Sequence, residues 1–196
     1  MPVTLPNCPP PSSFEIELVR SVVDLRPAFG GPVQRIERLG SRWRAVLRFE
    51  TMTSQQNRAW SDVDVEADTV RWAVPQLEFD VGSPGSSVQV DGSSQTGNVL
   101  KLKGLPAGYV MRKDQWFSII TGGVSYLYRV RADATASGAG VADVPVQPLI
   151  RAAHLNNDAV EVAEPIIEGF VVGPSRAQAW RRKVVPEMSF VIEERA

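Results

Sequence analysis

The residues of this sequence best suited to acid–base catalysis are His154 and Asp158. A histidine titrates near neutral pH, so it can take a proton from a nucleophile, and a nearby carboxylate can orient its ring. His154 is the one histidine of the chain, and it lies within Ala-Ala-His-Leu-Asn-Asn-Asp. This polar pattern is typical of a surface loop, which favours an exposed histidine over a catalytic base. The sequence therefore predicts no catalytic residue, and a protein that is not an enzyme.

Alternating carboxylates that could bind a metal ion lie at Asp62, Asp64, Glu66 and Asp68, where a helix is predicted. A spacing of two residues spreads side chains around a helix and does not gather them on one face. Calcium and magnesium need several oxygen ligands that converge on one point. A solvated helix face is therefore the better interpretation, and no metal ion or other cofactor is predicted.

Two further segments invite comparison with phosphate-binding sites. Residues 92–97, Gly-Ser-Ser-Gln-Thr-Gly, lack the lysine and the following helix of a phosphate-binding loop, so they are predicted to form a turn. The run Arg181-Arg-Lys183 is basic, but the whole chain has 21 basic and 22 acidic residues and a formal net charge of -1. This balance gives no long-range attraction to nucleic acid or to an anionic membrane. No nucleic-acid partner is expected.

The single cysteine, Cys8, excludes a disulfide within the chain and a cysteine-based metal site. No basic segment followed by an apolar run predicts a signal peptide, and no run approaches the roughly 20 apolar residues that span a bilayer. We therefore expect no direct insertion into a membrane.

The clearest structural pattern is a strand that leads into a short helix. Apolar side chains alternate from Trp43 to Phe49, which predicts a half-buried strand whose other face carries arginines. Thr53 and Gln56 have the spacing of a capping box, and Trp60, Val63 and Ala67 continue at helical spacing. Trp43, Trp60, Trp72 and Trp116 all fall on predicted inward faces, so core packing is their expected role.

Short alternating strands separated by glycine and proline fill most of the remaining chain, which predicts a mainly β protein. We expect an antiparallel β-sandwich with one short α-helix, formed by residues 14–82 plus 158–195, whose C-terminal strand pairs back into the first sheet. Residues 83–157, with five short strands, are expected to form an inserted small β-barrel or sandwich. Residues 1–13 are proline-rich and predict an extended arm, either disordered or lying on a neighbouring subunit.

Several short segments occur in a moderately specific order between residues 14 and 170. They are Phe29-Gly-Gly-Pro-Val-Gln, Gly40-Ser-Arg-Trp-Arg-Ala-Val-Leu, Met52-Thr, Val90-Asp-Gly-Ser-Ser-Gln-Thr-Gly-Asn-Val-Leu, Gly104-Leu-Pro-Ala-Gly, Tyr128-Arg-Val, Asp133-Ala-Thr-Ala-Ser-Gly, Pro148-Leu-Ile-Arg and Gly169-Phe. In this order the chain resembles minor tail proteins of long-tailed bacteriophages, of the distal tail or baseplate type.

The resemblance implies a structural virion protein at the tail tip, assembled in the host cytoplasm. Such proteins form a ring, usually a hexamer, that joins the tail-tube protein to the baseplate hub and the tail-fibre proteins. A β protein with open sheet edges and nearly balanced charge suits self-assembly of this kind. In a ring, Arg42, Arg44 and Arg48 would be possible subunit contacts.

Two alternative functions remain open from the sequence. A carbohydrate-binding module that recognises the bacterial surface would need exposed aromatic side chains on the inserted unit, and the possible glycan contacts are Tyr109, Trp116, Tyr126 and Tyr128. A tail-associated hydrolase would depend on His154 and Asp158.

Overall fold

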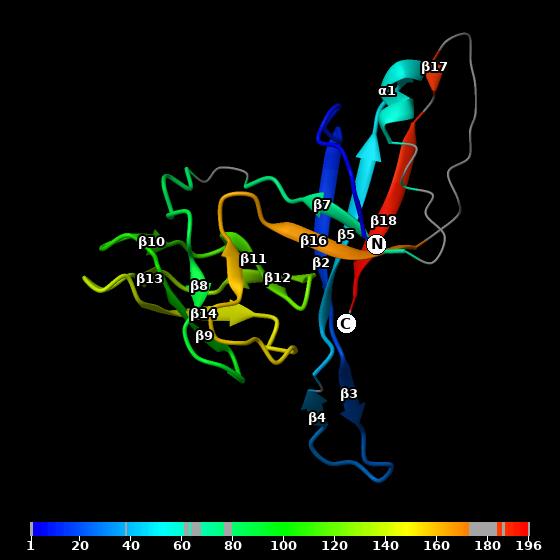
Figure 1. Cartoon of the computed structure of the whole chain (residues 1–196). Coiled ribbons are helices and arrows are strands. Elements are labelled where there is room, and N and C mark those ends of the chain that lie inside the picture. The colour runs from blue at the N-terminus through cyan, green and yellow to red at the C-terminus, as the bar shows by residue number, and fades with distance from the viewer. Residues whose placement is uncertain are drawn as a thin grey trace.

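The computed structural model describes residues 2–37, 39–60, 63, 68–76, 80–172, 184–185 and 187–195. Within these residues the chain is mainly β, with one short helix, a six-stranded sheet, a closed six-stranded barrel and three small two-stranded pairs (Figure 1). The predicted fold class, a larger β unit with one helix and a small barrel, is confirmed.

The six-stranded sheet is antiparallel except at one edge, where β1 runs parallel to β7. In spatial order its strands are β1 (Val3–Thr4), β7 (Val70–Ala73), β16 (Ile166–Val172), β18 (Met188–Glu194), β5 (Arg42–Phe49) and β2 (Ser13–Val19). Alternate side chains of β5 are buried as predicted, with 2% of Trp43, none of Ala45 and Leu47 and 3% of Phe49 exposed. The last strand, β18, pairs with β5, so the expected return of the C-terminal strand to the first sheet is confirmed.

The barrel closes around its own core. Its strands, in order around the barrel, are β11 (Trp116–Thr121), β12 (Val124–Val130), β14 (Ala142–Gln147), β9 (Val99–Lys103), β8 (Gln89–Val90) and β15 (Ala159–Glu161). Leu100, Phe117, Ile119, Tyr128 and Val144 are fully buried inside it. The sequence assigned residues 158–162 to the outer unit, but β15 pairs with β11 and β8 and closes the barrel, because Val160 faces the barrel core.

The helix α1 (Ser54–Ala59) begins at the predicted capping box. The Thr53 side chain accepts the Gln56 backbone N–H, and the Gln56 side chain accepts the Thr53 backbone N–H. Gln56 is therefore turned toward the cap and is exposed, while Trp60 and Val63 enter the core beside the sheet. Residues 61–62 and 64–67, over which the prediction continued the helix to Ala67, lie outside the described residues.

The proline-rich arm lies on its own chain. Val3–Thr4 forms the edge strand β1, Leu5 is 3% exposed in the core of the sheet, and the Pro9 carbonyl accepts the indole N–H of Trp60 at 3.2 Å. A single apolar anchor and these backbone contacts are enough to order the segment. The arm is therefore ordered against its own sheet, whereas its predicted contact with a neighbouring subunit stays a prediction.

The barrel packs against one face of the sheet through β11 and β12. Trp116 meets Trp43 edge-on, with ring centroids 4.8 Å apart, and Leu127 joins the core of the sheet. Gln76, just after β7, accepts the Trp116 N–H and donates to the Trp116 and Val162 carbonyls. Aromatic packing and this amide clamp therefore fix the barrel on the sheet.

Three two-stranded pairs complete the fold. They are β3 (Val22–Leu25) with β4 (Gln34–Glu37), β6 (Met52–Thr53) with β17 (Val184–Val185), and β10 (Val110–Met111) with β13 (Ala134–Thr135). The β3–β4 hairpin continues the β2 and β5 strands and projects away from both the sheet and the barrel (Figure 1).

Candidate interaction surfaces

A buried carboxylate, Glu194 at the end of β18, connects the sheet to the barrel. It accepts the backbone N–H of Trp43 at 3.0 Å and that of Leu127 at 2.7 Å, and it forms an ion pair with Arg151. The side chains of Arg151 and Glu194 are 4% and 0% exposed. Burial raises the pKa of Glu194, while Arg151 and the two N–H groups oppose that rise. Because its donors come from β5, β12 and the loop after β14, Glu194 holds three segments together.

A second buried carboxylate, Glu168 of β16, fixes the turn between β11 and β12. It accepts the Ser125 N–H at 3.0 Å, the Thr69 hydroxyl at 3.1 Å and the Arg71 Nε–H at 2.7 Å. Arg71 also donates to the Gly123 carbonyl in the turn. The sheet thus supplies two glutamates whose hydrogen bonds hold the barrel hairpin.

The lone histidine is buried, which makes the prediction of a surface histidine wrong. His154 has no exposed surface, because Tyr128 and Tyr126 cover its ring edge-on. Its Nδ1 lies 2.6 Å from the Thr121 hydroxyl, which donates to Asp158 at 2.6 Å, and its Nε2 lies 2.8 Å from the Tyr128 hydroxyl.

The order of these hydrogen bonds fixes where the protons lie. Since the Thr121 hydroxyl gives its proton to Asp158, the ring must donate through Nδ1–H and accept the Tyr128 hydroxyl at Nε2. Burial lowers the pKa of His154 to about 4 and raises that of Tyr128 to about 12, so both are neutral at pH 7.

This network suits a structural role better than a catalytic one. Thr121, His154 and Tyr128 are not among the residues that line the five main pockets found over the described part of the chain. The carboxylate Asp158 also accepts the Leu155 N–H at 2.8 Å. The network therefore fastens the loop before β15 to β11 and β12.

The three arginines predicted as subunit contacts lie on the outer face of β5, and each has a carboxylate partner on a flanking strand. Arg42 and Arg44 both bind Glu193, and these bonds hold the pKa of that carboxyl below its usual value. Arg44 also binds Glu17 at 3.0 Å, and Arg48 lies 3.8 Å from Glu15. Glu193 is mostly buried, with 14% of its side chain exposed, whereas Arg48 and Glu15 are both exposed, and an exposed ion pair contributes little to stability. A role for the arginines in subunit contact stays a prediction, but in this chain they are already paired.

The four aromatic residues suggested for glycan binding do not form one exposed platform. Tyr128 is fully buried in the barrel, so it cannot contact a glycan. Tyr126 faces the same barrel core, Trp116 packs on the sheet, and the Tyr109 hydroxyl donates to the Val81 carbonyl at 2.8 Å. Strand alternation explains the result, because Tyr126 and Tyr128 share the inward face of β12.

The β3–β4 hairpin carries the main unpaired apolar surface of the described residues. Register places Val23 opposite Ile36, and Leu25 follows on the same face, while Asp24 and Arg35 form an ion pair on the other face. Exposed fractions on the hairpin and its loops are 38% for Val23, 47% for Leu25, 102% for Phe29, 55% for Val33, 40% for Ile36 and 68% for Leu39. No described part of the chain covers the apolar face of this amphipathic hairpin.

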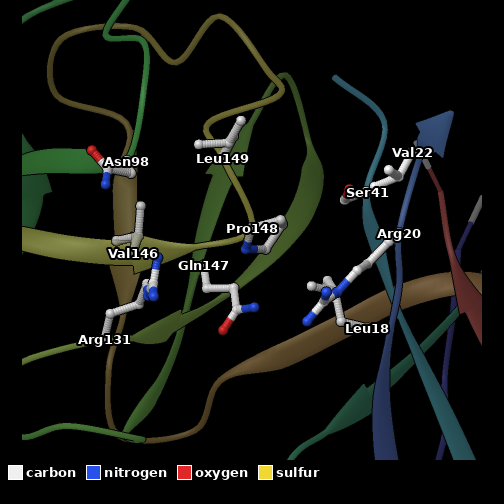
Figure 2. A pocket seen from close by; sticks show the side chains of 10 residues that line it. All are labelled: Leu18, Arg20, Val22, Ser41, Asn98, Arg131, Val146, Gln147, Pro148 and Leu149. Carbon is white, nitrogen blue, oxygen red and sulfur yellow. The ribbon is translucent and has the colours of Figure 1, made fainter. Parts of the chain in front are cut away.

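A cleft opens where the base of this hairpin faces the barrel (Figure 2). It encloses about 240 Å³ between the β2–β3 junction and the segments that flank β9, β12 and β14. The lining side chains are Leu18, Arg20, Val22, Ser41, Asn98, Arg131, Val146, Gln147, Pro148 and Leu149. This cleft was not predictable from local sequence pattern, because its two walls are far apart along the chain.

Two sequence features considered above cannot be compared with the structure. Asp62, Asp64, Glu66 and the basic run 181–183 lie outside the described residues. Within the described residues, no group of three histidine, cysteine or acidic side chains could hold a metal ion. No helix among the described residues is long and apolar enough to cross a membrane.

No protein-family model matches the chain, and no curated protein sequence is significantly similar to it.

Proposed function

We propose that this chain is a structural component of a phage tail tip or baseplate, in which identical copies form a ring between the tail tube and the hub and fibre proteins. The observation that carries the proposal is the β3–β4 hairpin with its bare apolar face. The order of short segments that resembles distal tail proteins supports the same assignment.

An isolated two-stranded hairpin is at best marginally stable in water. This one also exposes Leu25 and Phe29, and contiguous exposed apolar patches typically mark sites of association. A second surface that covers the hairpin would remove its apolar face from water and stabilise its strands. The proposal assigns that surface to the next copy in the ring.

Charge is compatible with contact between identical copies. The chain has a formal net charge of -1, so like copies repel one another only weakly. On the hairpin, Asp24 and Arg35 pair within the chain at 2.8 Å, which leaves no net charge from that pair. Apolar burial can therefore drive association without a large electrostatic cost.

The test is the oligomeric state of the purified chain with and without the apolar hairpin face. Light scattering coupled to size exclusion, with negative-stain electron microscopy, should show ring-shaped particles for the natural sequence. The double variant Leu25→Ser, Phe29→Ser should shift the population to monomers. The control Leu155→Ser changes a leucine that is 57% exposed on a barrel loop and should leave the rings intact.

A chain that stays monomeric over the whole accessible concentration range, and that is absent from purified tails, would contradict the proposal. If the hairpin variant forms rings equally well, the proposed ring would stand, but the hairpin would not be the contact between its subunits.

A further inference from the structure

The cleft in Figure 2 places two arginines on opposite walls. Arg20 extends from the β2–β3 junction and Arg131 from the segment after β12. Neither guanidinium has a hydrogen-bond or ion-pair partner among the described residues, in contrast to Arg42 and Arg44 on the sheet. A guanidinium is always charged at neutral pH and matches the geometry of a carboxylate. The cleft therefore contains two guanidinium groups that have no partner among the described residues and can bind an anionic group.

The amide of Gln147 presents a donor to the same space. Its Oε1 accepts the Arg129 Nη2–H at 2.9 Å, and this hydrogen bond fixes the orientation of the amide. The Nε2 group consequently faces the cleft, and Figure 2 shows it directed toward Arg20. The Asn98 side chain adds a second amide to the lining. A ligand that accepts hydrogen bonds would meet donors on both sides.

The charged side chains that line the cleft, Arg20 and Arg131, are both positive. Among the side chains that the structure describes, no aspartate or glutamate lines this cleft, although the whole chain has one more acidic than basic residue. Arg129, which hydrogen-bonds Gln147, lies 3.6 Å from the carboxylate of Asp114, and Asp114 is not among the residues that line the cleft. A locally positive cleft on a slightly acidic protein selects a negatively charged partner group.

We propose that this cleft binds a carboxylate side chain of an extended acidic peptide segment from a partner protein. Besides the donors, Leu18, Val22, Val146, Pro148 and Leu149 give the walls apolar surface, which would cover aliphatic side chains on either side of the carboxylate. The space of about 240 Å³ lies below the usual range for small-molecule sites, roughly 300–1,000 Å³, and suits one or two side chains.

Phosphate is the less suitable occupant. Phosphate sites commonly use the N-terminus of a helix or a run of backbone N–H groups, and the lining of this cleft comes from strands and their connecting segments. The paired apolar walls would also remain uncovered by a small inorganic anion. The proposal concerns a different surface from the apolar hairpin face, so it stands or falls independently of ring formation.

The test uses the full chain and a short fluorescent peptide with blocked ends and the internal segment Leu-Glu-Val-Asp. Fluorescence anisotropy should show binding, and a matched peptide with Gln and Asn in place of the acids should bind at least several-fold more weakly. Each of Arg20→Gln and Arg131→Gln should weaken binding of the acidic peptide by up to about fivefold, the upper end for a solvent-accessible ion pair.

The matched control is Arg112→Gln, because Arg112 is exposed between β10 and β11 and lies outside the cleft. Its affinity for the acidic peptide should equal that of the natural chain. Equal binding of the acidic and amide peptides, or unchanged binding in both cleft variants, would overturn the proposal. Inorganic phosphate that binds the chain more tightly than the peptide, and loses that binding in the cleft variants, would also overturn it.

Discussion

Two hairpins of this protein each have two adjacent glycines in the connecting segment, but their surroundings are opposite. Both β3–β4 and β11–β12 turn at a pair of adjacent glycines, Gly30–Gly31 and Gly122–Gly123. The β11–β12 hairpin turns one face into the barrel and the other onto the sheet, where Glu168 and Glu194 accept its N–H groups. The β3–β4 hairpin leaves its apolar face in water. Local sequence accounts for both hairpins, but contacts from other parts of the chain cover only β11–β12.

The largest loss of unfolding free energy should follow the removal of a side chain on which the covered β11–β12 hairpin packs. Trp43→Ala leaves a cavity against Trp116 and should lower the free energy of unfolding by roughly 3–5 kcal/mol. Urea denaturation, monitored by far-UV circular dichroism, measures this change in the free energy of unfolding. The control Leu25→Ala shortens a side chain on the bare hairpin and should cost far less. A loss near zero for Trp43→Ala would contradict the packing described.

A smaller loss is expected when the hydrogen bonds of the covered hairpin are weakened. Glu194→Gln removes the charge that faces Arg151, so the guanidinium stays buried without its counter-ion. The free energy of unfolding should fall by about 2–3 kcal/mol, as for a buried hydrogen bond to a charged group. Glu17→Gln, on the exposed face of β2, is the comparison and should change little. Equal effects of the two substitutions in urea would show that the barrel does not depend on Glu194.

Acid should loosen the covered hairpin through His154, which hydrogen-bonds Tyr128 of β12. The pKa of His154 is lowered from 6.5 to about 4, chiefly by burial; Asp158 opposes this shift and Arg151 adds to it. The unfolded chain therefore binds this proton below pH 6.5 while the folded chain stays neutral, so stability is full above pH 6.5 and falls as the pH drops toward 4.

At about 1.4 kcal/mol for each pH unit, the loss from His154 between pH 6.5 and pH 5 is roughly 2 kcal/mol. His154→Gln keeps hydrogen-bonding groups but cannot titrate, so its unfolding free energy should fall by about that much less over the same range. Chemical denaturation at pH 7 and pH 5 compares the two chains. Identical pH dependence would mean that His154 is not held neutral.

The smallest effect should be at the bare hairpin. Phe29 is 102% exposed at its tip, so Phe29→Ser should change the free energy of unfolding of the monomer by no more than about 0.5 kcal/mol. Thermal denaturation of dilute samples measures this, since dilution removes any association. A loss of more than about 1 kcal/mol would show that the hairpin tip is covered within the monomer.

The covered parts of the fold were largely predictable from local pattern. Alternation from Trp43 to Phe49, the capping box at Thr53 and the strands of the barrel follow from side-chain period and turn residues. The burial of His154 did not, because its neighbours in sequence are polar and its partners Thr121 and Tyr128 come from other strands.

The burial of Glu194 in β18 was predictable from the alternation of the strand, although it was not among the predictions above. Glu194 follows Met188, Phe190 and Ile192 at alternate positions, so it has the phase of an inward residue. A buried carboxylate is costly without a partner, and Arg151, its partner, is 43 residues away in the chain. Distance along the chain likewise hid the cleft, since Arg20 and Arg131 meet only through the packing of barrel on sheet.

The position of β18 has a consequence for folding during synthesis. Among the strands that the structure describes, β18 is the last to leave the ribosome, yet it lies between β16 and β5 inside the sheet. The barrel, whose strands end at Glu161, can close while that central place is still empty. Until β18 arrives, β5 and β16 each keep an unpaired edge that is open to chaperones and proteases. Insertion of β18 therefore joins the β1–β7–β16 part of the sheet to the β5–β2 part, and the backbone N–H of Trp43 gains its acceptor, Glu194, only at that step.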